Sequence, residues 1–256
     1  MSVILRPHVP PFAGTRAAPL DTSAPWEPAD SGAAAFTPAP GAAWWLRGDN
    51  VTLNGGTVAS WLDISGNGRH WTQGSAPLQP TWVASAINGQ PGLSFSAAAQ
   101  QELVGPDLIA VGLTAAETFI VFQANADPPA TGVKCGFWRT ESAAAVAVVP
   151  FTDGVIYDGF GSTVRKTTVN PTPSLASPRI YSVITTSSEW TSSLDGVQIF
   201  TTATNAVGWN TATRIGSSVT NWFDGIMCEW LVYPAKLSTA DRAKTIAYLK
   251  ARYGIA

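Results

Sequence analysis

The sequence has little charge and no long hydrophobic run. Its 256 residues include 15 Lys and Arg and 17 Asp and Glu, so charged side chains make up only 12%, about half the roughly 25% that is usual in soluble domains. The net charge is −2 and no basic cluster is present, which argues against nucleic acid as a partner. No stretch approaches the ~18 apolar residues of a membrane helix, so no membrane partner is expected.

Cysteine is also scarce. Cys135 and Cys228 lie far apart and outside any CxxC pair, which excludes a disulfide framework and predicts free, buried thiols. The first residues, MSVILRPHVPPF, hold only three apolar side chains before Arg6 and Pro7. They lack the apolar core of a secretory signal. We therefore expect assembly in a cytoplasm and no export through a signal peptide.

Proline, in contrast, is concentrated at one end. The first forty residues hold eight of the 19 prolines. Proline fixes φ and removes a ladder donor, so a central strand or a helix is excluded there. We expect residues 1–41 to form an extended Pro/Ala-rich arm that docks on neighbouring subunits. The candidate docking residues are Arg6, Pro7, Pro10, Pro11, Phe12 and Trp26.

Residues 42–256 are predicted to form one β domain. Short segments rich in Val, Ile, Thr and aromatic residues alternate with Gly, Pro, Asn and Asp, a pattern typical of a two-sheet sandwich. The predicted strands are residues 43–46, 58–64, 92–96, 117–124, 135–140, 145–151, 154–160, 179–188, 189–202, 213–217 and 224–234.

Two local signals are sharper. Asp195-Gly196 lies between β-forming residues, which predicts a hairpin with a type I′ turn. After Pro234 the apolar residues recur at the spacing of one helix face, with Ser238 as N-cap and Gly254 at the left-handed C-cap position. One short amphipathic helix is therefore expected over about 238–253.

Several motifs resemble the concanavalin A-like, laminin-G-like jelly-roll superfamily. They are SLDGVQI, TRIGS and FDGIMCEWLVYPAKLSTADRAKTIAYLKARYGI in the last third, with SWLDISGNGRHWTQ (60–73) and NGQPGLSFS (88–96) before them. The resemblance covers about residues 43–256. It implies an all-β fold, a two-sheet antiparallel jelly-roll β-sandwich. The superfamily includes lectins, glycosidases, adhesion modules and structural proteins of tailed bacteriophages, so the fold does not decide the function.

Catalytic signatures are missing. The glucanases of this superfamily carry Glu-x-Asp-x-x-Glu on one strand, and this sequence has no such motif. Glu229, where the family often keeps a glutamate, is expected to bond backbone donors near the terminal turn. No Gly-x-Ser-x-Gly elbow occurs, and His70 is expected to hydrogen-bond within its own loop. We therefore expect no enzyme.

A calcium-binding site is one interpretation of the loop Asp63-Ile64-Ser65-Gly66-Asn67-Gly68. The loop offers a single carboxylate at Asp63, a hydroxyl and an amide, whereas hard cations favour several oxygen ligands, usually with two or more carboxylates. The same residues are equally suited to an Asx-type turn, in which the side chains hydrogen-bond to the backbone of their own loop. No other cofactor is expected.

Eleven tryptophans are present. The core candidates are Trp61, Trp138, Trp190 and Trp230. The surface candidates, in or near loops, are Trp71, Trp82, Trp209 and Trp222. The favoured interpretation is that the surface aromatics cover the ends of the sandwich or make subunit contacts. The alternative is a glycan platform, whose candidate residues are Trp71, Trp209, Asn221, Trp222 and Asp224.

The sequence favours a non-enzymatic virion structural protein of a tailed phage, a capsid decoration or cement protein. Its partners would be the major capsid protein and further copies of the chain. The alternative is a glycan-binding module of a tail fibre or adhesin, and a glycosidase is a more distant one. Sparse charge suits both subunit contacts and hydroxyl-rich ligands.

Overall fold

The computed structural model describes residues 37–142 and 146–256. Residues 1–36 of the expected arm, which include its docking residues from Arg6 to Trp26, lie outside the described residues. The elements are β1 (Trp44–Asn54), β2 (Thr57–Asp63), β3 (Trp71–Thr72), η1 (Ala76–Leu78), β4 (Thr81–Ile87), β5 (Gln90–Phe95), β6 (Leu103–Val104), α1 (Leu108–Val111), β7 (Ala116–Ala124), η2 (Gly132–Lys134), β8 (Trp138–Glu141), β9 (Tyr157–Asp158), β10 (Lys166–Thr167), β11 (Arg179–Thr186), β12 (Glu189–Leu194), β13 (Val197–Thr202), β14 (Trp209–Ile215), β15 (Gly225–Tyr233) and α2 (Thr239–Tyr253).

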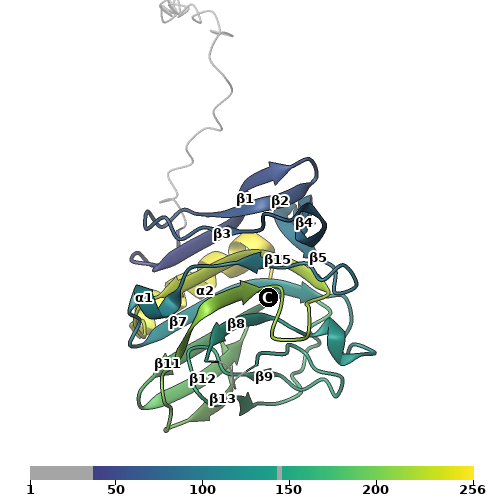
Figure 1. Cartoon of the computed structure of the whole chain (residues 1–256). Helices are drawn as coiled ribbons and strands as arrows, with labels where there is room; N and C mark the ends of the chain where they lie inside the picture. Colours follow the sequence, from purple (N-terminus) through teal and green to yellow (C-terminus); the bar gives the residue numbers. More distant parts are fainter. Residues whose placement is uncertain (1–36, 143–145) are drawn as a thin grey trace, which may run out of the picture. The chain divides into compact units, whose positions relative to one another are not determined.

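The strands form an antiparallel β-sandwich, as the sequence predicts (Figure 1). Hydrogen bonds run in the order β13-β12-β11-β7-β15-β5-β4-β2-β3-β6-β14-β8, and β1 joins β15 to β2. The path is continuous because β1 and β5 share one edge of β15. The chain thus curls from one layer into the other, with the apolar core between the layers.

A second apolar layer lies on the outer face of the β11-β7-β15 region, where α2 packs (Figure 1). Strand β7 shows why. Ile120 and Phe122 face the core between the sheets, whereas Phe119 and Val121 face α2. Successive side chains of a strand point to opposite faces, so a strand covered on both sides is apolar throughout. The central run FIVF (119–122) has this pattern.

Both sharp local predictions are confirmed. Asp195 and Gly196 have φ angles of 52° and 86° between β12 and β13. Helix α2 begins after Ser238, whose hydroxyl accepts from the Asp241 N–H, and ends at Gly254 in the left-handed region. No described helix is both long and apolar enough to cross a bilayer.

Some strand predictions are wrong. The predicted strand over 145–151 is, within residues 146–151, a loop in which Val148 makes isolated bridges to Gly136 and Tyr157. Pro150 cannot donate to a ladder, so a regular strand cannot continue through it. The segment 154–160 contains only the two-residue β9. The four-residue helix α1, which was not expected, adds to the single predicted helix.

Candidate functional site

The predicted aromatic platform does not assemble as a whole. Trp71 is 0% exposed, and its ring centroid lies 4.7 Å from that of Trp230. Trp71 is the register partner of the core residue Trp61, and directly opposite residues of paired strands point to the same face. Trp209 is 8% exposed and donates its indole N–H to the Leu113 carbonyl (2.6 Å). The predicted surface position is therefore wrong for Trp71 and Trp209.

The remaining platform residues do lie at the surface, in the loop between β14 and β15. Asn221, Trp222 and Asp224 are half-buried. The Asp224 carboxylate accepts from the Ala97 N–H (3.4 Å) and lies 3.8 Å from Lys134 Nζ. Asp224 thus holds neighbouring loops together. The Asn221 carbonyl accepts from the Ser218 N–H (2.9 Å), whereas its side-chain amide makes no hydrogen bond to any described residue.

A pocket of about 310 Å³ opens beside Asn221. This volume falls at the lower end of the usual range for ligand sites, roughly 300–1,000 Å³. Two segments distant in sequence form it: the stretch from the loop before β9 to the β9–β10 region, and the turn before β15. The lining residues are Val146, Val148, Phe151, Tyr157, Arg165, Thr220 and Asn221.

Tyr157 is the central aromatic of this pocket. Its hydroxyl donates to Asp153 Oδ2 (2.8 Å), which raises the pKa of Tyr157 and keeps the phenol neutral. Its ring meets Phe151 edge-on at 5.7 Å, and the Arg165 Cζ lies 5.0 Å from its centroid. An aromatic held on two sides in this way presents a fixed apolar wall beside polar groups.

The sequence did not identify Tyr157 or Arg165. Segment 154–160 has the composition of an ordinary strand, and Arg165 lies outside every motif. The alternation of Tyr157 with buried Ile156 and Asp158 marks it as the outward-facing residue of that segment. That alternation is a property of the folded chain, because β9 has only two residues and is too short to show a period of two in the sequence. Thr220 and Asn221 are joined to it only by the tertiary fold.

Asp63 organises a separate loop. Its carboxylate accepts from the backbone N–H of Trp45, Ser65 and Arg69 and from the Ser65 hydroxyl, each at 2.9 Å. Although burial acts to raise it, the pKa of Asp63 is held below its usual value by these hydrogen bonds. His70 Nδ1 accepts from the Asp63 N–H within the loop, as predicted (2.9 Å). The Asx-type alternative therefore accounts for these residues.

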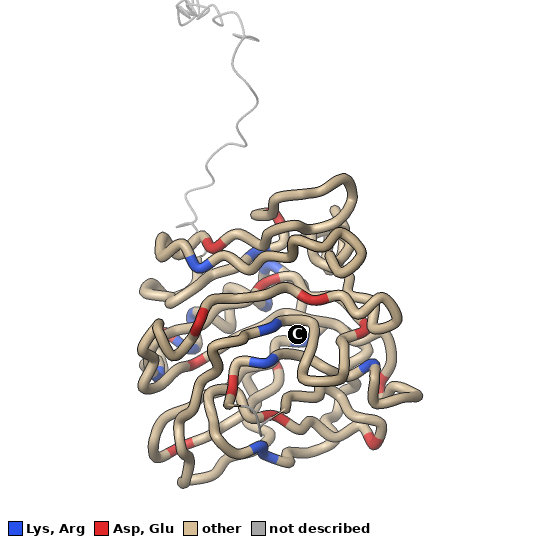
Figure 2. Tube along the Cα trace, viewed as in Figure 1, with Lys and Arg blue, Asp and Glu red and all other residues tan. Residues whose placement is uncertain are grey.

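Calcium binding stays a prediction for this loop. Across residues 37–142 and 146–256, no group of three or more His, Cys, Asp or Glu side chains gathers as a metal site would require. Charges of both signs are scattered along the described trace (Figure 2).

Glu229 lies under α2, fully buried. Its carboxylate accepts from Trp45 Nε1 (2.5 Å) and from the hydroxyls of Tyr248 (3.1 Å) and Tyr253 (2.8 Å). The expected backbone donors are therefore replaced by side chains, because α2 points two tyrosines at the strand. Glu229 holds the helix against the sheet.

Fold and pocket together define a jelly-roll-like β-sandwich with a small loop-lined cavity. No protein-family model matches the chain, and no curated protein matches its sequence. Solved structures do share its fold. Domain 4 of AbnA, a GH43 extracellular arabinanase from Geobacillus stearothermophilus, is 13% identical with a TM-score of 0.54, over 81% of this chain and 98% of that one.

Two further structures are similar. Trypanosoma rangeli sialidase is 9% identical with a TM-score of 0.57, over 82% of this chain and 32% of that one. The binding domain of Paraclostridial Mosquitocidal Protein 1 is 10% identical with a TM-score of 0.57, over 81% and 52%. The chain thus spans about a third of the sialidase chain. At these identities the likeness shows the fold alone.

Proposed function

We propose that this domain binds a neutral, hydroxyl-rich glycan in the pocket around Tyr157. The observation that carries the proposal is the pocket itself, in which an aromatic ring lies beside an amide, a hydroxyl and a guanidinium. Sugars present apolar ring faces together with hydroxyl groups. Apolar walls with a few converging polar groups are the usual composition of such sites.

Two further facts support a glycan. The arabinanase domain of the same fold was solved in complex with arabinotriose. The chain is weakly charged, which suits an uncharged ligand. Asn221 belongs to the platform that the sequence predicted, so the proposal keeps one part of that prediction and moves its aromatic from Trp71 and Trp209 to Tyr157.

The virion role stays a prediction. It depends on an arm whose docking residues lie outside the described residues, and on the major capsid protein as partner. Co-sedimentation of the full chain with particles from its native source would test it. The expectation that the chain is not an enzyme likewise stays a prediction.

The test of glycan binding is calorimetric titration with a panel of neutral oligosaccharides that includes arabinotriose. Removing the Thr220 hydroxyl or the Asn221 amide deletes one hydrogen bond to the ligand, worth about 1 kcal/mol. We therefore expect Thr220→Ala and Asn221→Ala each to weaken binding by about fivefold to tenfold. Tyr157→Phe should bind more tightly than Tyr157→Ala, because it keeps the ring.

Thr211→Ala is the matched control, since Thr211 is exposed on β14 and does not line the pocket. Binding that is equal in Thr220→Ala, Asn221→Ala, Thr211→Ala and the unchanged protein would place the glycan elsewhere. Absence of binding across the panel would contradict the proposed function.

A further inference from the structure

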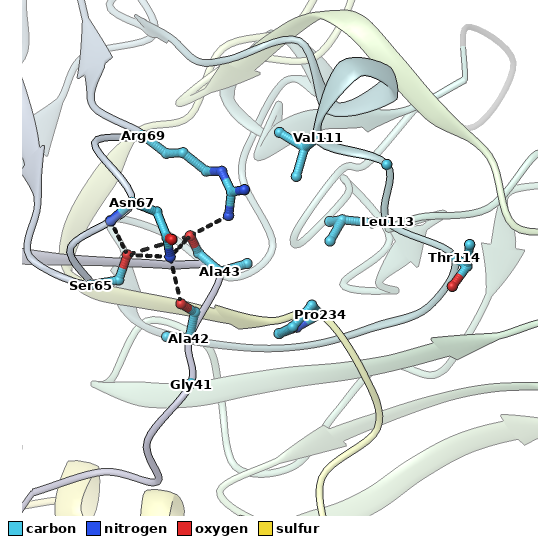
Figure 3. A pocket seen from close by; sticks show the side chains of 11 residues that line it. Gly41, Ala42, Ala43, Ser65, Asn67, Arg69, Val111, Leu113, Thr114 and Pro234 are labelled. Carbon is cyan, nitrogen blue, oxygen red and sulfur yellow. Dashed lines mark hydrogen bonds between the residues drawn. The ribbon is translucent and has the colours of Figure 1, made fainter.

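A second pocket, of about 520 Å³, lies at a different place in the fold (Figure 3). It is bounded by the chain entering β1, the loop after β2, the turn after α1 and the end of β15. One wall is polar and carries Ser65, Asn67 and Arg69. The opposite wall carries Val111 and Leu113 (Figure 3). A ligand that fills it meets a cation on one side and apolar groups on the other.

Arg69 is the only charged residue that lines this pocket in the described chain. Its Nη1 donates to the Ala43 carbonyl (2.7 Å). In the part of the chain that the structure describes, no Asp or Glu lies within ion-pair distance of Arg69. A guanidinium has five N–H donors in a planar fork that matches a carboxylate. The Ala43 bond fixes its position and leaves donors for a ligand.

The backbone carbonyls of Ala42 and Ala43, at the polar wall, are already bonded. The Asn67 Nδ2 group donates to the carbonyls of Ala42 (3.1 Å) and Ala43 (3.0 Å). The Ala43 carbonyl also takes the Arg69 bond. Because their oxygens already accept hydrogen bonds, these carbonyls repel a bound anion less than carbonyls without donors would. The Asn67 amide oxygen and the Thr114 hydroxyl remain as partners for ligand hydroxyls.

Both walls are fixed before any ligand enters. The Asp63 carboxylate bonds the backbone of Ser65 and Arg69 on the polar side. On the other side, the Trp209 indole bonds the Leu113 carbonyl at 2.6 Å. Gly112, in the left-handed region at φ 74°, ends α1 at this point. A site that needs little reordering loses less free energy on binding.

We propose that this pocket binds the carboxylate of an acidic sugar, with Arg69 as the carboxylate-binding residue. The carboxylate pairs with the guanidinium, the ring packs on Val111 and Leu113, and the hydroxyls reach Asn67 and Thr114. A plain aliphatic acid would make the ion pair and the apolar contact but not the hydroxyl contacts. A neutral sugar would lack the ion pair. The proposal is independent of the neutral-glycan pocket, since the two pockets share no residue.

The test is an NMR titration of the full chain with D-glucuronate, D-glucose and butyrate. Glucuronate should bind at least fivefold more tightly than either of the others. Arg69→Gln should weaken glucuronate binding at least fivefold. Because that change also removes the Ala43 bond, Thr114→Glu serves as a second variant. It leaves Arg69 in place but puts a competing carboxylate in the pocket, and we expect the same loss.

Lys244→Gln is the charge-matched control, since Lys244 is exposed on α2 and lines neither pocket. It should bind glucuronate like the unchanged protein, and so should Thr220→Ala. Equal affinity for glucose or for butyrate would overturn the acidic-sugar assignment. So would unchanged glucuronate binding in folded Arg69→Gln and Thr114→Glu. Loss of neutral-glycan binding in Thr220→Ala alone concerns only the other pocket.

Discussion

Glu141 and Asp158 are fully buried carboxyl groups with no cationic partner among the described side chains. Burial raises the pKa of Glu141 to about 8, and the charge of Asp158 adds to the rise. Burial also raises the pKa of Asp158, to about 6, although Trp138 Nε1 (2.9 Å) and the Tyr181 hydroxyl (3.0 Å) donate to it. An acid with a raised pKa binds its proton more tightly in the folded state than in the unfolded chain.

The free energy of unfolding should therefore fall as the pH rises. For Glu141 the loss begins near the unfolded pKa of 4.5 and is complete above about 8. We expect Glu141→Gln to remove on the order of 2 kcal/mol of the decrease between pH 5 and pH 8. Urea unfolding at a series of pH values measures this slope.

Glu189→Gln gives a control of opposite sign. Although burial acts to raise it, the pKa of Glu189 is lowered because Lys236 Nζ donates to its carboxylate. A lowered pKa stabilises the protein above the unfolded pKa of 4.5, and that contribution is lost on acidification. Its removal should therefore lower the free energy of unfolding by a few tenths of a kcal/mol above pH 4.5 at this exposed pair, and it should leave the slope between pH 5 and pH 8 unchanged. Parallel slopes for Glu141→Gln and the unchanged protein would contradict the burial argument.

Single residues were predictable where the strand pattern is long enough to fix a face. Trp61, Trp138, Trp190 and Trp230 were placed in the core, and all are 0% exposed. Trp71 was misplaced because β3 has only two residues, too few to show a period of two. The face to which Trp71 points is set by the pairing of β3 with β2, which depends on the tertiary structure. Tyr157 was missed for the same reason.

Elements with their own end signals were predictable to within a residue or two. Helix α2 shows this, because Ser238 and Gly254 mark both ends. Strands β6, β9 and β10 have two residues each and carry no sequence period. They form because adjacent strands of the same chain supply backbone hydrogen-bond partners. Arg214 and Ile215 of β14, for example, pair with β6.

The N-cap of α2 provides a test at this scale. The Ser238 hydroxyl accepts from the Asp241 N–H at 3.1 Å and donates to the Asp241 carboxylate. We expect Ser238→Ala to lower the free energy of unfolding by about 1 kcal/mol. Thr239→Ala, one position into the helix and exposed, should change it by no more than a few tenths. Equal shifts of the urea midpoint would show that the cap contributes nothing.

The domain as a whole is closed by contacts between the two ends of the described chain. Trp44 of β1 is the register partner of Val232 of β15, and such distant pairing leaves no local sequence signal. The closure extends to Ala39, which is 4% exposed. Its N–H donates to the Thr245 hydroxyl (3.1 Å), and the Tyr233 hydroxyl donates to its carbonyl (2.9 Å). Packing of the domain thus begins before residue 42, the predicted boundary.

Two truncations test this closure. A chain that starts at Thr37 keeps every contact of the compact unit 37–256, so its unfolding midpoint in urea should match that of the full chain. A chain that starts at Ala42 loses Ala39 and leaves the Thr245 and Tyr233 hydroxyls without these partners. Since a lost buried hydrogen-bond partner costs about 1–3 kcal/mol, the shorter chain should be less stable by that amount. Identical midpoints for the two truncations would mean that Ala39 packs without stabilising the domain. A shared loss relative to the full chain would instead assign the stabilisation to residues before Thr37.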